Sequence, residues 1–162
     1  MPSRSGDAPS LGAELGVDGV LLKQILPNCA LHEHRVSGDD RGSLISLQTT
    51  AEIPFEIKRV YVVYDTKPLV ERGHHAHKSL EQWIVCVAGS CMFTVDDGIE
   101  RREVLLDNPN KGLHIGNGIW REMRHFAPGT ALVVLASTLY DLEDYIRDYD
   151  DFLAYARGEM VR

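Results

Sequence analysis

The chain has 162 residues, of which 44% are hydrophobic and 25% are charged, and its formal net charge is -7. This length and composition suit a single globular domain with one sizeable core. The acidic balance and the lack of a basic run argue against nucleic-acid binding, which needs clustered Lys and Arg. No apolar stretch approaches the ~20 residues that span a bilayer, and no signal peptide is recognised, so we expect a cytoplasmic protein.

The N-terminal segment mixes Pro, Ser, Gly and Ala without periodicity. Such a composition is typical of a flexible extension. We therefore expect residues 1–20 to be a flexible extension and residues 21–162 to form the domain. Cys29, Cys86 and Cys91 include no CxxC pair, so we expect packed, reduced thiols rather than a disulfide framework or a zinc knuckle.

Short apolar or alternating runs recur from Leu44 onward, and turn-forming residues separate them. The runs cover residues 44–47, 60–64, 83–87, 92–95, 104–106, 119–123 and 132–135. The turns lie at residues 96–98, 108–112, 117–118 and 127–129. This rhythm predicts an all-β protein, an antiparallel sandwich or barrel.

The C-terminal segment changes period. Its apolar residues follow helical spacing among acidic ones: Leu142, Tyr145, Ile146, Tyr149, Phe152, Leu153 and Ala156. We expect one amphipathic helix here. Its apolar stripe would cap the barrel, or else pack on a second subunit, and the capping arrangement is preferred.

Residues 72–82 contain the most informative pattern, a histidine pair in a strand-like stretch. His75 and His77 are two apart, so on an extended chain both side chains point to one face, whereas His74 points to the other. Imidazole titrates near pH ~6.5, so each ring can accept a proton, donate one or bind a metal at neutral pH. The pair therefore predicts either a metal site or acid/base chemistry.

The metal interpretation rests on a motif. The spacing His75-x-His77-x3-Glu81, followed by Gly89, resembles the first motif of the cupin superfamily. Cupins commonly hold Fe, Mn, Ni or Zn with these residues and a histidine from a later strand. Arg121 stands where that histidine is expected, and a guanidinium has no lone pair for a metal. A metal-dependent cupin enzyme is therefore kept only as an alternative, which needs His114 or His125 on the same face.

The remaining interpretations need no metal. The two histidines are either partly exposed strand residues without chemistry, or an acid/base pair acting on an anionic substrate. Arg72 and Lys78 flank them and concentrate positive charge in one short segment, which favours the second. Two imidazoles on one wall can take a proton from one carbon and return it to a neighbouring atom.

At this point a closer resemblance appears. Residues from about 41 to 155 are similar to the dTDP-4-keto-6-deoxyglucose 3,4-ketoisomerases, cupins of the WxcM-like group. The similarity is carried by Arg41-Gly42-Ser43-Leu44, Ile53-Pro54-Phe55, Ile57-Lys58-Arg59-Val60-Tyr61, Asp65-Thr66-Lys67, Arg72-Gly73, His75-Ala76-His77-Lys78, Leu80-Glu81-Gln82, Val85-Cys86-Val87, Gly89-Ser90, Asp96-Asp97-Gly98, Trp120, Glu122-Met123, Val134-Leu135-Ala136-Ser137, Asp144-Tyr145-Ile146-Arg147 and Tyr149-Asp150.

The resemblance implies a cupin or jelly-roll β-barrel that forms a homodimer with exchanged strands. It implies a metal-free reaction on a dTDP-linked keto sugar, with no cofactor, centred on His75 and His77. Removal of the C3 hydrogen next to the C4 ketone leaves an enediolate that is protonated again at C4. We expect His77 to be the main base and His75 to relay or orient, although these roles are exchangeable. The alternative from another class is a non-catalytic sugar-nucleotide binding cupin.

Substrate recognition is expected from charged and flat side chains. Arg59 and Arg72 are candidates for the diphosphate, because a guanidinium matches phosphate oxygens bidentately. Tyr61 and Trp120 are candidates for packing on thymine or sugar, with core packing as the alternative for each. The family resemblance also points to Arg41 and Arg121 as substrate-binding residues that influence the C4 configuration. Their combination matches neither the galacto-forming nor the gluco-forming members.

Overall fold

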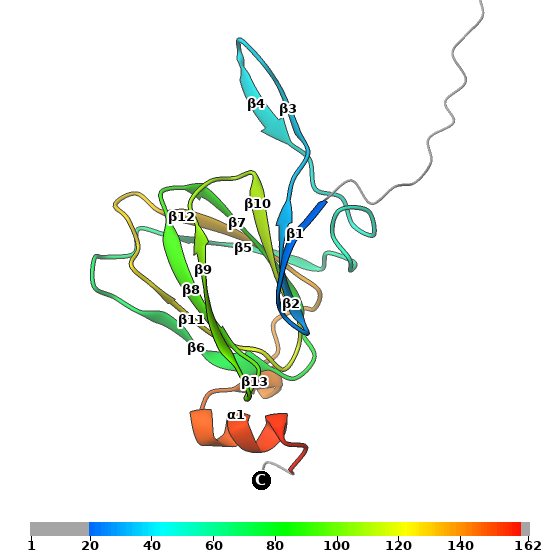
Figure 1. Ribbon diagram of the computed structural model, residues 1–162, viewed down its shortest axis with the longest axis vertical. Helices are drawn as coiled ribbons and strands as arrows, with labels where there is room; N and C mark the ends of the chain where they lie inside the picture. The colour runs from blue at the N-terminus through cyan, green and yellow to red at the C-terminus, as the bar shows by residue number, and fades with distance from the viewer. Residues whose placement is uncertain (1–19, 160–162) are drawn as a thin grey trace, which may run out of the picture.

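The computed structural model describes residues 20–159, and its architecture is that of a β-barrel closed at one end by a helix (Figure 1). Two antiparallel sheets face each other across the core. The predicted all-β cupin-type barrel with one C-terminal helix is thereby confirmed. The predicted flexible extension lies outside the described residues, except for Val20, with which the first strand begins.

The larger sheet has six strands. Their order is β1 (Val20–Leu26), β2 (Cys29–Glu33), β10 (Lys111–Ile115), β7 (Gln82–Ala88), β12 (Ala131–Ala136) and β5 (Arg59–Tyr64). The facing sheet has five, in the order β13 (Tyr145–Ile146), β6 (Arg72–His77), β11 (Trp120–Arg124), β8 (Cys91–Asp96) and β9 (Arg101–Leu106). A separate hairpin pairs β3 (Val36–Asp39) with β4 (Gly42–Ile45).

The main core lies between the two sheets. It is built from alternate residues of each strand, because successive side chains of a strand point to opposite faces. Ile84 of β7, Phe93 and Val95 of β8, and Leu132 of β12 are among its buried members. Burying each such side chain contributes about 1.5–3 kcal/mol relative to leaving it exposed. The sheets are therefore held face to face, and the reactive side chains discussed below are set into a rigid wall.

A second apolar cluster covers the outer face of the six-stranded sheet. Ile53 and Phe55, from the connection between β4 and β5, pack against Trp83 and Val85 of β7 and Leu135 of β12. This segment leaves the far edge of the sheet uncovered, so Val60, Val62 and Tyr64 of β5 are exposed.

The C-terminal helix is shorter than the periodicity predicts. The segment expected to be helical from residue 142 contains a 3-10 turn (Leu142–Asp144), strand β13 and only then α1 (Tyr149–Ala156). Asp144 and Ile146 are buried because β13 pairs with β6, and this pairing overrides the helical spacing. Phe152 of α1 packs under Trp120, so the helix covers one end of its own barrel.

Several strands were not predicted. The first three strands lack a clear alternating apolar pattern, and β10 begins inside the predicted turn at 108–112, whereas the strand-like stretch around His75 and His77 is strand β6. The unpredicted segments are strands because each pairs with a neighbour in the sheet, which sequence periodicity does not record. The three cysteines are free and buried, as expected. Within residues 20–159, the structure has no helix that is both long and apolar enough to cross a bilayer.

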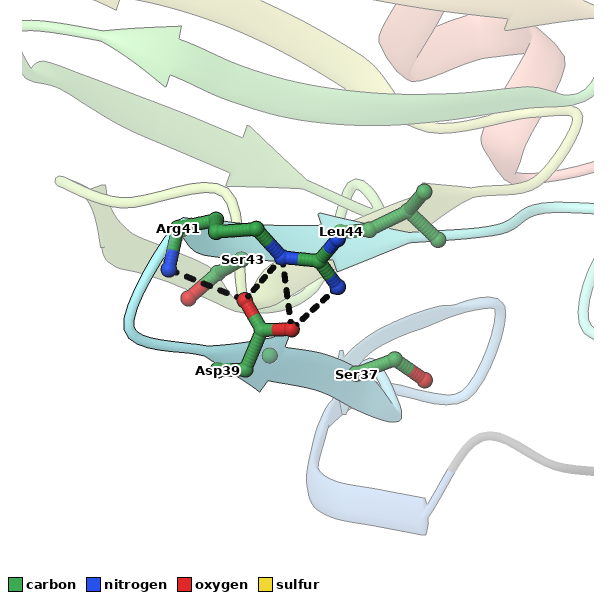
Figure 2. Close-up of a pocket in the computed structure, with 7 residues that line it drawn as sticks. Ser37, Asp39, Arg41, Ser43 and Leu44 are labelled. Carbon is green, nitrogen blue, oxygen red and sulfur yellow. Dashed lines mark hydrogen bonds and ion pairs between the residues drawn. The ribbon is translucent and has the colours of Figure 1, made fainter.

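The β3–β4 hairpin projects away from the barrel (Figure 1). Arg41 lies at its turn and forms an ion pair with Asp39 of the opposite strand (Figure 2). Leu44 is exposed on the same hairpin. A hollow of about 570 Å³ is lined only by hairpin residues, and it is the open concave side of a twisted two-stranded ribbon rather than an enclosed site.

Candidate active site

A β-bulge sets the direction of the histidine pair. Strand β6 pairs with β11 so that Arg121 lies opposite His75 and Glu122 opposite Gly73, which leaves His74 as the extra residue. Gly73 has φ +90, and a Cβ there would lie 2.7 Å from the carbonyl oxygen of Arg121, so only glycine fits. Bulges commonly re-aim a side chain next to a functional site. Here His74 turns outward, as alternation predicts, and its Nε2 lies 3.2 Å from the carboxylate of Glu71.

His75 and His77 point to the same side of β6, as the sequence predicts. Their ring centroids are 4.9 Å apart, and the rings meet edge to face. Tyr145 of β13 contacts both rings, at 5.0 Å from His75 and 4.3 Å from His77. The two imidazoles therefore form one packed unit whose orientation is fixed by a third ring.

His75 is held as a neutral base. Its Nδ1 lies 3.0 Å from the carbonyl oxygen of Gly73, which can only accept, so Nδ1 carries the proton and Nε2 keeps its lone pair. Burial, reinforced by the positive charge of Arg121, lowers the pKa of His75 from 6.5 to about 4. At neutral pH the ring is ready to accept a proton at Nε2.

His77 has a carboxylate partner that the sequence analysis did not identify. Its Nδ1 donates to Oδ2 of Asp144 at 3.0 Å, and both side chains are buried. This bond again leaves Nε2 as the basic nitrogen. Burial, together with Arg121 and His75, lowers the pKa of His77 to about 3, against the opposing effect of Asp144. The His77–Asp144 pair has the geometry in which a carboxylate fixes the tautomer of a catalytic imidazole.

Asp144 is itself held firmly. Its Oδ1 accepts from the backbone N–H and the hydroxyl of Ser79, and its Oδ2 also accepts from the N–H of Leu80. Burial alone would raise the pKa of Asp144, but these hydrogen bonds and the nearby His77 hold it below its usual value. The carboxylate therefore remains ionised and fixed in place next to His77.

Arg121 lies at the centre of the barrel, and it is unusual for a guanidinium. It is 2% exposed, and none of its three side-chain nitrogens has a hydrogen-bond partner among the described residues. Burial lowers the pKa of Arg121 from 12.5 to about 10, so it still carries its charge at neutral pH. A positive charge thus stands behind the two histidines and opposes their protonation.

An open cleft of about 570 Å³ lies in front of His75. The cleft is rich in arginine and tyrosine, and its lining residues are Arg59, Tyr61, Val63, Val70, Glu71, Arg72, Gly73, His75, Met123, Tyr140, Tyr145 and Arg147. Arg59 is 5.4 Å from the ring of Tyr61 and 5.6 Å from that of Tyr140, within the range of cation–π contacts. Three cationic side chains against one carboxylate suit an anionic ligand with a flat group.

The structure brings some predicted substrate-binding residues together and not others. Arg59, Tyr61 and Arg72 line the cleft, and Tyr61 is also packed against the core. Trp120 does not: it is buried beneath α1 and donates to Glu122, so the core-packing alternative describes its position. Arg41 lies on the projecting hairpin and is not among the residues that line the cleft of its own chain.

The cupin metal set is not assembled. The side chain of Glu81 points away from the histidine pair. Its carboxylate lies 2.8 Å from Nε2 of His114, on the outer face of the larger sheet. Strand alternation explains this, because Glu81 and Trp83 share the face opposite to Gln82. Among residues 20–159, no three His, Cys, Asp or Glu side chains are placed to hold a metal ion.

Four functional candidates were missed as site residues. Asp144, Tyr145 and Arg147 lie in the segment whose spacing predicts helix, and Tyr140 lies just before it. Arg147 is 4.2 Å from the ring of Tyr145, which positions both at the cleft. The charged residues that interrupt this apolar stripe are the sequence feature that could have indicated a functional role for the segment.

Acidification is expected to destabilise the fold. The pKa values of His32, His34, His75 and His77 all lie below 6.5 in the folded chain. The unfolded chain therefore binds more protons below pH ~6.5, so stability is full above this pH and falls as the pH drops towards about 4. We expect Tm to decrease steadily between pH 7 and pH 5. A Tm that is constant or rises over this range would contradict the neutral, buried state of these rings.

Comparisons with known proteins show the family of this chain. The family described as FdtA, WxcM-like C-terminal matches residues 27–157. A curated relative, the TDP-4-oxo-6-deoxy-alpha-D-glucose-3,4-oxoisomerase of Aneurinibacillus thermoaerophilus, is 50% identical over 117 residues, which are 72% of this chain and 84% of the relative.

Solved structures show the same fold. A 3,4-ketoisomerase from Helicobacter canadensis has 48% identity and a TM-score of 0.78, with 80% of this chain and 98% of that chain covered. The sugar 3,4-ketoisomerase QdtA from Thermoanaerobacterium thermosaccharolyticum, in complex with TDP, has 39% identity and a TM-score of 0.80, with 83% and 98% covered.

Proposed function

The chain belongs to the FdtA, WxcM-like C-terminal family, and from this premise we propose that it is a sugar 3,4-ketoisomerase that converts a TDP-linked 4-keto-6-deoxyhexose into the 3-keto sugar. The observation that carries the proposal is the neutral histidine pair at the head of an arginine-rich cleft. The relatives are named for this reaction, and the QdtA structure holds TDP.

The chemistry consists of proton transfers at C3 and C4 and at the oxygens that these two carbons carry. A base removes the hydrogen on C3, and the electrons of the C–H bond form a C3–C4 double bond while the C4 carbonyl becomes an enediolate oxygen. The C3 hydroxyl then loses its proton, the oxygen on C4 gains one, and an acid delivers a proton to C4. The result is a ketone at C3 and a hydroxyl at C4. Electrons and protons balance without a redox cofactor.

We assign the C3 base to His75, whose captured proton goes to the oxygen on C4, and we assign to Nε2 of His77, held by Asp144, the uptake of the C3 hydroxyl proton and its delivery to C4. On the family resemblance alone we expect His77 to be the first base, with exchangeable roles, but His75 is the ring that lines the cleft, and His77 is buried one layer deeper. Asp144 is a positioning residue, because it acts on substrate only through the His77 tautomer. Acid and base catalysis of this kind contributes about 10²–10⁴-fold in rate.

The cationic side chains of the site would act at two different parts of the substrate, the diphosphate and the sugar. Arg59 and Arg72, together with Arg147, would bind the diphosphate in the cleft, with Tyr61 against the sugar. Arg121 would stabilise the enediolate from behind the histidines, since fixed charge in a dry site is stronger than in water.

The proposal is tested by incubating metal-stripped protein with TDP-4-keto-6-deoxyglucose and excess chelator, and following C3 and C4 by NMR. We expect the 3-keto sugar to form at the rate of the untreated protein, up to the equilibrium ratio of the two ketones. Activity that disappears with chelator and returns with one metal would identify the metal-dependent alternative. TDP binding without any conversion would identify a passive binding protein.

We further propose a homodimer in which the β3–β4 hairpin reaches the cleft of a second copy and places Arg41 at the substrate. The hairpin leaves its own barrel, and its exposed Leu44, like Val60 and Val62 on the edge strand β5, is apolar surface that a second copy would cover. Edge strands and isolated hairpins with apolar surface are suited to pairing with another chain.

This arrangement has a complementation test. R41A and H75N would each be impaired alone, but a co-expressed one-to-one mixture should recover about a quarter of the wild-type sites, because half of the dimers are mixed and each has one intact site. Size measurement of the purified variants is the control for assembly. A mixture no more active than the average of its parents would rule out a shared site.

The pH profile offers a further check. Because both histidines have lowered pKa values, we expect kcat/KM to stay constant down to about pH 5 and to fall towards an acid limb near pH 4. Brief assays after a pH jump separate this limb from unfolding. An acid limb near 6.5 would show that the rings are solvated as in a peptide, contrary to this site.

A further inference from the structure

The substrate cleft continues inward as a narrow space of about 20 Å³. Tyr61 and His75 line both the cleft and this inner end, and Arg121 lines the inner end only. The inner end also contains Gln82, a buried amide that the proposed mechanism does not use. Burying an amide is costly unless it is hydrogen-bonded, so the partner of Gln82 indicates what this residue does.

The partner of Gln82 is the hydroxyl of Tyr61. Nε2 of Gln82 donates to the oxygen of Tyr61 at 2.6 Å. The two residues lie on β7 and β5, which are separated by β12, and the residue of β12 opposite Gln82 is the small Ala136. The long side chain of Gln82 can therefore reach the phenol across the middle strand, and three neighbouring strands of the larger sheet hold the contact.

This hydrogen bond decides where the proton of Tyr61 points. A phenol oxygen that accepts from an amide N–H directs its own O–H away from that amide. Burial raises the pKa of Tyr61 above its usual value, although Arg121 opposes this effect, so the phenol keeps its proton at neutral pH. Within residues 20–159, Tyr61 donates no hydrogen bond, so its O–H is available to a ligand at the inner end of the cleft.

We propose that Gln82 is a positioning residue that holds the hydroxyl of Tyr61 as a hydrogen-bond donor to the substrate. This inference rests on the proposed function. Negative charge develops on a sugar oxygen in the enediolate, and a donor that already faces this oxygen stabilises the charge without reorganising. Without the amide of Gln82, the phenol O–H rotates between several directions and faces the substrate for only part of the time.

The role of Gln82 is tested with Q82M, which keeps a buried side chain of similar length but removes the amide. For TDP-4-keto-6-deoxyglucose, we expect kcat to fall about tenfold in Q82M and about 10²–10³-fold in Y61F, which removes the donor itself. Because Gln82 acts through the phenol, Q82M combined with Y61F should cost no activity beyond that of Y61F alone. The same loss from Q82M in both backgrounds would overturn the proposal.

The direction of the hydrogen bond is tested without substrate, by fluorine NMR of protein that carries ring-fluorinated tyrosine. The signal of Tyr61 is the one that is missing from Y61F. A donor to the phenol oxygen favours the phenolate, so we expect the pKa of Tyr61 to rise in Q82M. An unchanged or lower pKa in Q82M would overturn the proposal. The other charged or titratable groups around the phenol, which Q82M leaves in place, are Arg59, Arg72, His75, Arg121 and Tyr145.

The matched control is Q24M. Nε2 of Gln24 also donates at 2.6 Å, to the backbone oxygen of Leu26, but Gln24 lines no part of the cleft. Q24M should leave kcat and the pKa of Tyr61 unchanged. If Q82M does not fold, Q82N, whose amide is one methylene shorter, serves for both measurements.

The two readouts separate this inference from the proposed function. A raised pKa of Tyr61 in Q82M, together with a wild type that converts no substrate, would support the direction of the hydrogen bond and refute the proposed function. A lowered pKa in Q82M, together with a wild type that converts substrate, would refute only the role of Gln82.

Discussion

Replacing His75 with asparagine is expected to lower kcat by about 10²–10⁴-fold, the contribution of a positioned general base. Asn keeps a polar side chain of similar reach, but its amide cannot accept a proton at neutral pH. Affinity for TDP should change little, because the arginines of the cleft remain in place. Turnover by NMR and TDP binding by calorimetry are the measurements.

The matched control for this variant is H74N. His74 is the neighbouring histidine on the opposite face, partly exposed and paired with Glu71, and its φ of 53° is one that asparagine tolerates. We expect near wild-type turnover from H74N. Equal losses of turnover in H74N and H75N would show that the loss comes from disturbing strand β6 and not from removing the ring that faces the cleft.

Replacing Asp144 with asparagine is expected to lower kcat by about 10²–10⁴-fold, although this side chain does not reach the cleft. An amide can donate to Nδ1 of His77, which would place the proton of that ring on Nε2 and remove the basic nitrogen from the reaction. KM should change much less than kcat. The loss of the carboxylate should also alter the acid limb of kcat, which a purely structural defect would not move.

The control for this second variant is S79A, which removes one of the hydrogen bonds to Asp144 and leaves the carboxylate. It should cost about 1 kcal/mol of stability and keep turnover within roughly tenfold of the wild type. If S79A and D144N lost activity and Tm together, Asp144 would be a structural support and not a positioning residue. The assigned role requires D144N to lose far more activity than its Tm explains.

The sequence was sufficient for the fold class and for the centre of the site. Alternating runs predicted the strands of the barrel core, and the spacing of His75 and His77 predicted two rings on one face. Both follow from local geometry, because the period of a strand is a property of the chain itself. Strands such as β2 and β10 were missed because their stability comes from pairing with partners distant in sequence.

The rest of the site depends on contacts that no local pattern records. Asp144 is 67 residues from His77, and it reaches the ring only because β13 pairs with β6. Trp120 and Arg121 are neighbours in sequence, yet strand alternation sends one beneath the helix and the other into the barrel. Trp120 was a candidate because of its flat side chain, with core packing as the alternative, and Arg121 because of the family resemblance; the two side chains lie on opposite sides of β11.

The central claim is that a histidine pair moves hydrogen as a proton between C3 and C4, and the position of solvent deuterium tests it most directly. Chelator-treated wild-type protein is incubated with TDP-4-keto-6-deoxyglucose in D₂O, and the product is read by NMR at C4. Because imidazole N–H groups exchange with solvent, we expect deuterium at C4 of the 3-keto sugar. A product that retains all of the original C3 hydrogen at C4, with no solvent deuterium, would indicate direct hydride migration and contradict the account.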